Sequence, residues 1–161
     1  MHSQQKRNRR KGAEIFEFGL VLVPLLGFVF LIIDVGWAVF ARGVLQHAVR
    51  EGVRYAVTSQ IMSGLGQKDS IKHVVQSEAM GLLAGPAGLD RIQVRFYTPD
   101  TFTDVSSDAG ANASGNLVEV SVEGFPHAPL LPLLRNALPF SLSATSIDRM
   151  EASPPTGPPP L

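Results

Sequence analysis

The chain has 161 residues, with 14 basic and 14 acidic side chains and no cysteine. The lack of cysteine excludes a disulfide framework and a thiolate metal site. Five of the basic residues lie within the first eleven positions, where no acidic residue accompanies them. Because a long apolar stretch follows this basic leader, residues 1–12, we expect the leader to set membrane topology and to contact anionic lipid rather than nucleic acid.

The apolar stretch covers about residues 18–41 and predicts one membrane-spanning helix. No residue from Phe18 to Ile33 is charged, and the apolar character resumes after Asp34 as far as Ala41. Such a helix, at about 1.5 Å per residue, is roughly 36 Å long and crosses a hydrocarbon core of about 30 Å. A cleaved secretory signal has a shorter apolar region. Because basic flanks stay in the cytoplasm, the residues after about position 42 are expected on the outer side of the membrane.

Two carboxylates interrupt the apolar stretch, Glu17 near its start and Asp34 near its end. An acid inside a membrane helix costs about 2.5–3.5 kcal/mol, so it normally marks a partner, a polar cavity or a nearby interface. Asp34 either reaches back to the lipid headgroups or belongs to a buried functional pair. Pro24 lies inside the apolar stretch and removes the hydrogen bond to the carbonyl of Leu20. Either the helix kinks there, or local adjustment of the backbone satisfies this carbonyl.

The helical pattern continues past the span, so one helix is expected over residues 13–61. Ala48, Gly52 and Ala56 recur every four residues and form a small-residue ridge, which allows close approach of another element. Polar and aromatic side chains accompany this ridge: Arg50, Glu51, Arg54 and Tyr55. The pattern leaves two partners open for the ridge, the chain's own outer domain and another subunit.

Residues 62–152 predict an outer module of the α+β class, in which a second helix packs on a small antiparallel sheet. Asp69 or Ser70 is expected to cap the helix. A set of apolar residues is expected to point from this segment toward a core: Ile71, Val74, Val75, Met80, Leu82 and Leu83. Alternating patterns predict about three strands, over residues 91–97, 117–123 and 140–147.

Three further segments lack a regular pattern. Residues 98–116 are rich in Asp, Ser, Gly and Asn and predict a long exposed loop. Residues 125–139 contain four prolines and predict an extended or short helical crossover that buries its leucines: Leu130, Leu131, Leu133 and Leu134. Residues 153–161 predict a disordered or polyproline tail.

Residues that could support catalysis or bind a metal are scattered. Only His47 and Glu51 have the i, i+4 spacing that aims two ligands at one point, and two ligands are too few for a metal site. Asp100, Asp104 and Asp108 lack the glycine and glutamate of a calcium loop, so ordinary solvation is expected. No nucleophile elbow or phosphate-binding glycine loop is present. We therefore expect no enzyme activity, no catalytic residues, no metal and no cofactor.

The features from Arg9 to Val57 form one pattern. They are a basic leader ending in Gly12, Glu17-Phe18 five and six residues later, Pro24, an acid followed by Val35-Gly36, and the run Ala48-Val49-Arg50-Glu51-Gly52-Val53-Arg54-Tyr55-Ala56. In this pattern the chain resembles the TadE-like proteins, minor pilin-like subunits of the tight adherence (Tad or Flp-type) pilus machinery. The run is similar to their Ala-Arg-Glu-Gly-Ala-Arg-Tyr-Ala block. Beyond Val57 the resemblance is architectural.

The resemblance implies cleavage by a prepilin peptidase after Gly12, on the cytoplasmic side, with Ala13 as the first mature residue. Glu17 would then be the fifth mature residue, whose carboxylate pairs with the terminal amine of a neighbouring subunit. The implied location is the bacterial inner membrane. The implied partners are other pilin-like subunits, the inner-membrane assembly platform and the lipid bilayer.

The sequence thus predicts a TadE-like subunit for assembly of a tight adherence pilus, anchored by its amino-terminal helix. One alternative is an unprocessed single-pass anchor that carries a periplasmic scaffold or binding domain of an envelope complex. Another alternative, a tethered hydrolase, requires a cluster of nucleophile and base that only the folded chain can reveal.

Overall fold

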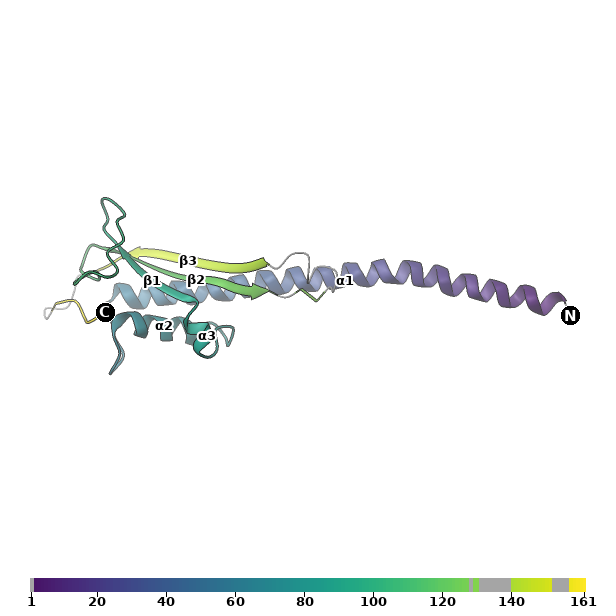
Figure 1. Ribbon diagram of the computed structural model, residues 1–161, viewed down its shortest axis with the longest axis horizontal. Helices are drawn as coiled ribbons and strands as arrows, with labels where there is room; N and C mark the ends of the chain where they lie inside the picture. Colours follow the sequence, from purple (N-terminus) through teal and green to yellow (C-terminus); the bar gives the residue numbers. More distant parts are fainter. Residues whose placement is uncertain (1, 128, 131–139, 152–156) are drawn as a thin grey trace. The chain divides into compact units, whose positions relative to one another are not determined.

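The computed structural model describes residues 2–127, 129–130, 140–151 and 157–161, with side chains from residue 14 onward. Three helices precede three strands along the chain (Figure 1). The first helix, α1, extends over His2–Val57 and continues through Pro24. It ends four residues before the expected position, because the chain turns at Ser59, whose φ is 55°.

The chain divides into two units within α1. One unit holds Met1–Trp37 with Ala128–Pro139, and the other holds Ala38–His127 with Phe140–Leu161. We call the second unit the folded module. Because the division falls at Trp37, the last part of α1 is a structural element of the folded module rather than a linker to it.

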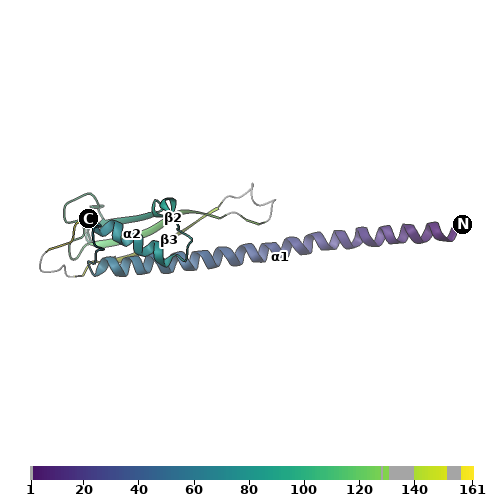
Figure 2. The same cartoon turned by 90° about the horizontal axis from the view of Figure 1, so that it is seen from below.

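A three-stranded antiparallel sheet in the order β1, β2, β3 forms one layer of the folded module (Figure 2). Its strands are β1 Ile92–Tyr97, β2 Leu117–His127 and β3 Phe140–Arg149. The register of β2 against β3 shifts between Val122 and Phe125, which marks an irregularity in β2. The α+β class and the sheet of three strands are confirmed.

The core lies between one face of this sheet and the helices α1 and α2, the latter over Gln67–Glu78. The strands bury alternate residues on this face: Ile92, Val94, Phe96, Val118, Val120, Val122 and Ala144. The helices add Leu45, Ala48, Val49, Val53, Ala56, Ile71 and Val75. Because successive strand residues point to opposite faces, the residues between them lie on the face away from the helices.

Helix α2 differs from its expected form at both ends. It follows Gly66 without a side-chain cap, so the prediction of an Asp69 or Ser70 cap was wrong. The Ser70 hydroxyl instead donates to the Gly66 carbonyl at 2.8 Å. The helix stops at Glu78, and Met80 beyond it is 74% exposed, contrary to its expected place in the core. A short helix, α3 over Pro86–Leu89, then leads to β1.

The irregular segments also depart from expectation. In the loop 98–116, Ala111 and Asn112 are buried, so this loop is not wholly exposed. The first residues of the expected crossover belong to β2, which reaches His127. Leu130 is 60% exposed rather than buried. The predictions for Leu131, Leu133, Leu134 and residues 152–156 fall outside the described residues.

Candidate functional site: the apolar helix and its polar partners

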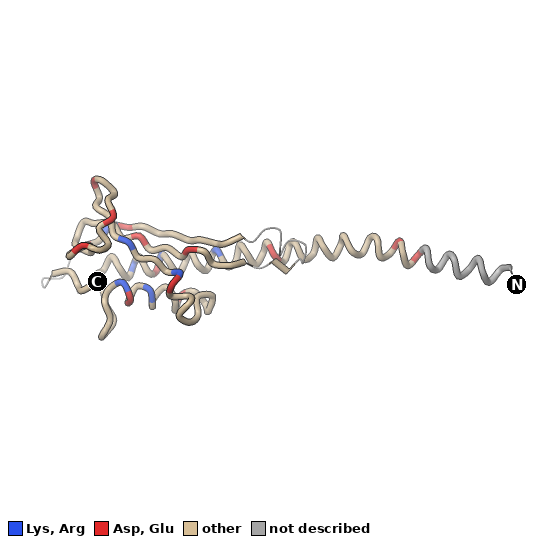
Figure 3. Tube along the Cα trace, viewed as in Figure 1, with Lys and Arg blue, Asp and Glu red and all other residues tan. Residues whose placement is uncertain are grey.

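The amino-terminal part of α1 presents large apolar side chains on every side. Those more than 40% exposed are Ile15, Phe16, Phe18, Leu20, Val21, Val23, Leu25, Leu26, Phe28, Val29, Phe30, Leu31, Ile32, Ile33 and Val35. Figure 3 shows a long stretch of α1 without charged positions in this part. By length and composition the helix can cross a membrane. A helix that is apolar all round is typical of a membrane span or of a helix covered by other helices.

Glu17 lies at the start of this apolar surface. Its side chain is exposed, and among the described residues it forms no hydrogen bond or ion pair. The backbone of Gly12 and Ala13, the expected processing site, lies about one turn earlier in the same helix. Glu17 is thus an exposed carboxylate beside an apolar surface.

Asp34 has a different environment. Its side chain is only 6% exposed, and Oδ1 accepts a hydrogen bond of 2.8 Å from the backbone N–H of Leu130. Both residues belong to the same unit of the chain. Gly36, two residues further along α1, faces open space, since an added Cβ would have no neighbour within 4 Å. Of the two interpretations of Asp34, the structure therefore favours burial, with a backbone group as one partner.

The small-residue ridge faces the interior of the chain's own folded module. Ala48 and Ala56 are fully buried. A Cβ added to Gly52 would lie 2.4 Å from Cγ2 of Val75 on α2 and 3.5 Å from Cγ1 of Val120 on β2. Of the two partners that the sequence left open, the structure places the chain's own helix and sheet against the ridge.

The charged residues of the same run lie outside the core, whereas Tyr55 packs against its edge. Arg50 and Arg54 are exposed, whereas Glu51 and Tyr55 are half-buried. A depression between α1 and α2 is lined on the α1 side by Glu51, Arg54 and Tyr55. Val74 and Glu78 line it on the α2 side. The run Ala48–Ala56 therefore has one face that packs in the core and one face whose charged groups are exposed or half-buried.

His47 pairs with α2 rather than along its own helix. Its Nε2 lies 3.7 Å from Oε2 of Glu78, and both side chains are about half exposed. An exposed contact of this kind contributes at most about 1 kcal/mol. The structure thus gives His47 a surface contact in place of a metal-binding geometry with Glu51.

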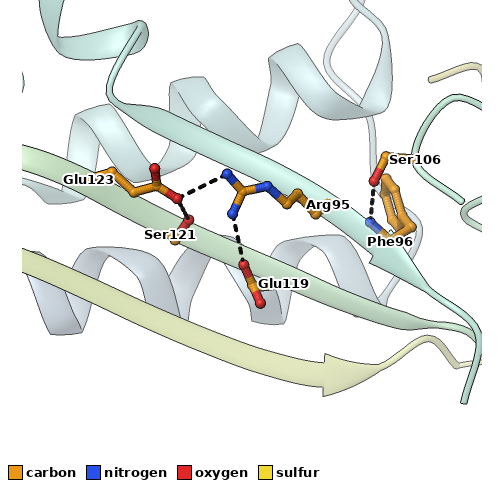
Figure 4. A network of polar contacts seen from close by, with 6 residues as sticks. All are labelled: Arg95, Phe96, Ser106, Glu119, Ser121 and Glu123. Carbon is orange, nitrogen blue, oxygen red and sulfur yellow. Dashed lines mark hydrogen bonds and ion pairs between the residues drawn. The ribbon is translucent and has the colours of Figure 1, made fainter. Parts of the chain in front are cut away.

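An ion-pair network lies on the face of the sheet away from the helices (Figure 4). The Arg95 guanidinium donates to Glu119 at 3.2 Å and pairs with Glu123 at 3.0 Å. The Ser121 hydroxyl donates to Glu123 at 3.3 Å. The hydrogen bond to Glu123 raises the pKa of Arg95. The sequence analysis did not identify this network, although Arg95 and Glu119 alternate with core residues in the strand patterns.

The described residues offer no metal centre. Among them, no group of three or more His, Asp or Glu side chains could hold an ion. Of the three regularly spaced loop aspartates, Asp104 accepts a hydrogen bond of 2.8 Å from the backbone N–H of Ser106. Hydrogen bonds from the hydroxyl and N–H of Ser106 lower the pKa of this carboxyl. Asp104 thus stabilises a local turn of its own loop.

Two buried amides form a polar contact that the sequence analysis missed. Gln67 and Asn112 are no more than 1% exposed. The Asn112 Nδ2 donates to Gln67 Oε1 at 2.5 Å, and Gln67 Nε2 donates to the carbonyl of Ala56 at 3.2 Å. The pair therefore ties the start of α2 to the end of α1 and to the loop before β2.

The same two residues hold the last part of the chain. Asn112 Nδ2 donates to the Pro159 carbonyl at 2.8 Å, and the backbone N–H of Gln67 donates to the Pro160 carbonyl at 2.8 Å. Gly66 permits this approach, because an added Cβ would lie within 2.3 Å of the Leu161 carbonyl oxygen. Residues 157–161 thus have specific contacts with the folded module, which the prediction of a disordered tail did not include.

Comparison with known protein families supports the resemblance on which the sequence interpretation depends. Residues 12–54 match the family model described as TadE-like protein. The match covers Gly12, Glu17, the apolar stretch and the run as far as Arg54, so it confirms the resemblance. The chain carries a TadE-like segment, and its one membrane-capable helix among the described residues fits a single-pass membrane protein. Searches of curated proteins and of solved structures give no significant match.

Proposed function

We propose that the protein is a pilin-like subunit for assembly of a tight adherence pilus. The observation that carries this proposal is the TadE-like segment, whose amino-terminal half is a helix with an exposed apolar surface and two exposed acids, Glu14 and Glu17, at its start. The folded module then lies in the periplasm or on the filament surface. Its role is structural, and the subunit needs no cofactor.

The exposed apolar surface limits where this helix can reside. Burying one large apolar side chain is worth about 1.5–3 kcal/mol relative to water, so exposing the whole surface to water would cost tens of kcal/mol. Lipid covers the surface before assembly. Removal of the helix from lipid becomes favourable only where other helices cover the same side chains, as in a bundle of pilin-like subunits.

Glu17 supplies the specific step in this proposal. A prepilin peptidase cleaves after Gly12 on the cytoplasmic side, and the new amine of Ala13 on one subunit meets the Glu17 carboxylate of its neighbour. The pairing offsets the desolvation of both charges as the helices leave the membrane surface and pack together. The exposure of Glu17, and its lack of a polar contact with the described residues of its own chain, support this role.

The alternative function is an unprocessed membrane anchor for a periplasmic scaffold domain. The observation that favours it is that Gly52 and Ala48 pack in the chain's own core. The small-residue ridge therefore does not contact other subunits. In this case only lipid surrounds the amino-terminal part of α1.

Photo-cross-linking in cells with an intact pilus machinery tests the proposal. A benzophenone amino acid replaces Phe28, which is 62% exposed on the apolar part of α1, or Phe102, which is 66% exposed on the folded module. We expect irradiation at Phe28 to yield covalent adducts with other pilin-like subunits, and these adducts to disappear when the assembly platform is deleted. If Phe28 forms adducts with lipid alone, the anchor is the correct function. Phe102 controls for contacts made by the module.

A further inference from the structure

A buried carboxylate inside an apolar helix requires a polar partner, and Asp34 obtains one from a distant part of the chain. The donor is the backbone N–H of Leu130, 96 residues away in sequence and 2.8 Å from Oδ1. Pro129, next to Leu130, is buried. Leu130 lies between β2 and β3 in the sequence, and its backbone returns to α1 at the level of Asp34.

The position of Asp34 defines where Leu130 lies relative to a bilayer. Asp34 is flanked by Ile33 and Val35, which are 48% and 54% exposed and belong to the apolar surface that lipid would cover. A backbone group within hydrogen-bond distance of Asp34 shares its depth. The Leu130 side chain is itself 60% exposed, although it is apolar. Water is a poor environment for this side chain, whereas the border of the hydrocarbon layer is a favourable one.

The composition of the connection fits the same environment. Residues 128–139 contain five leucines and three prolines, and Arg135 is their only charged residue. Transfer of the Leu130 side chain from water into lipid contributes about 1.5–3 kcal/mol.

We propose that Leu130, between β2 and β3, is a second membrane contact of this protein. Leu130 inserts into the interfacial layer of the bilayer beside α1, and the hydrogen bond from its N–H to Asp34 holds it there. Asp34 is thus a positioning residue for a lipid-binding segment. The inference depends on the proposed insertion of α1 into a membrane.

The absence of cysteine from the chain makes this inference directly testable. The full-length protein is reconstituted in phosphatidylethanolamine and phosphatidylglycerol vesicles, with a nitroxide on one introduced cysteine. The labelled variants are Leu130→Cys, Val35→Cys in α1, and Ile147→Cys, which replaces a residue 49% exposed on β3. Spin relaxation then reports collisions with oxygen, which enters lipid, and with a hydrated nickel chelate, which lipid excludes.

We expect the Leu130 probe to match the Val35 probe, with strong oxygen collisions and several-fold weaker nickel collisions than the Ile147 probe. If nickel collisions at Leu130 equal those at Ile147, the Leu130 side chain lies in water and the inference is wrong. If collisions with both reagents are weak, a protein partner covers this side chain and the inference is also wrong. If the Val35 probe itself collides freely with nickel, the membrane insertion of α1 fails as well. The two failures are therefore distinguishable.

Substitution of Asp34 tests the hydrogen bond. In the Leu130→Cys protein, Asp34→Leu removes the acceptor and is expected to raise nickel collisions several-fold, toward the value at Ile147. Asp34→Asn retains an acceptor oxygen and should leave the Leu130 probe in lipid. The Val35 probe should respond to neither change. A Leu130 probe that stays in lipid in the Asp34→Leu protein would contradict the positioning role of Asp34.

Discussion

Replacement of Glu17 by alanine is expected to remove the protein from sheared filaments while leaving it in the membrane. The variant lacks the carboxylate that matches the amine of Ala13 in a neighbouring subunit. Stranding one charge of a buried pair costs about 3–5 kcal/mol, which is a loss of roughly 100-fold or more in the assembly equilibrium. Membrane insertion should not suffer, because alanine is more apolar than glutamate. Immunodetection in the filament and membrane fractions measures both effects.

Glu14→Ala is the matched control for this experiment. Glu14 is exposed on the same helix and carries the same charge, but it lies only one residue after the expected mature amino terminus. We expect the Glu14 variant to enter filaments at least as well as the wild type. Equal incorporation of the Glu17 variant and the wild type would refute the charge pairing.

Replacement of Gly52 by alanine is expected to destabilise the folded module. Its Cβ would lie 2.4 Å from Cγ2 of Val75, and Val75 is fully buried and cannot move into solvent. Overpacking of a core costs about 1–3 kcal/mol, whereas the gain in helix propensity from glycine to alanine is about 1 kcal/mol. The net loss of up to about 2 kcal/mol should speed hydrogen exchange of the buried β2 amides up to roughly 30-fold, because about 1.4 kcal/mol is a factor of ten.

Gly43 provides the control within the same helix. A Cβ at Gly43 would have no neighbour within 4 Å, so Gly43→Ala should slow exchange or leave it unchanged. The double variant Gly52→Ala, Val75→Ala should lose less stability than the sum of its single changes, because removal of the Val75 methyl groups makes room for the new Cβ. Additive losses would indicate that the contact with Val75 is not the cause.

The helix and strands were predictable because their signals are periodic and local. An unbroken apolar stretch needs no tertiary contact to be identified, and alternation over residues 92–97 and 117–122 requires one buried face whatever covers it. The exact residues at which α1 ends and α2 begins were not predictable. They depend on a positive φ at Ser59 and on Gly66, whose lack of a side chain makes room for Leu161.

The polar contacts of the candidate site depend on residues far apart in sequence. Asp34 and Leu130 are 96 residues apart, and Asn112 lies 45 residues from Gln67 and 47 from Pro159. No periodic pattern marks such pairs. The ridge at Gly52 shows a related limit, because small side chains predict a close approach but fit many partners. The identity of the partner depends on Val75, whose place opposite Gly52 follows only from the packed fold.

Mass spectrometry of the mature amino terminus, on protein isolated from cells that assemble the pilus, tests the central claim most directly. The account predicts that the chain begins at Ala13, which frees the amine needed to pair with Glu17. A mature protein that retains Met1 and the basic leader would contradict it.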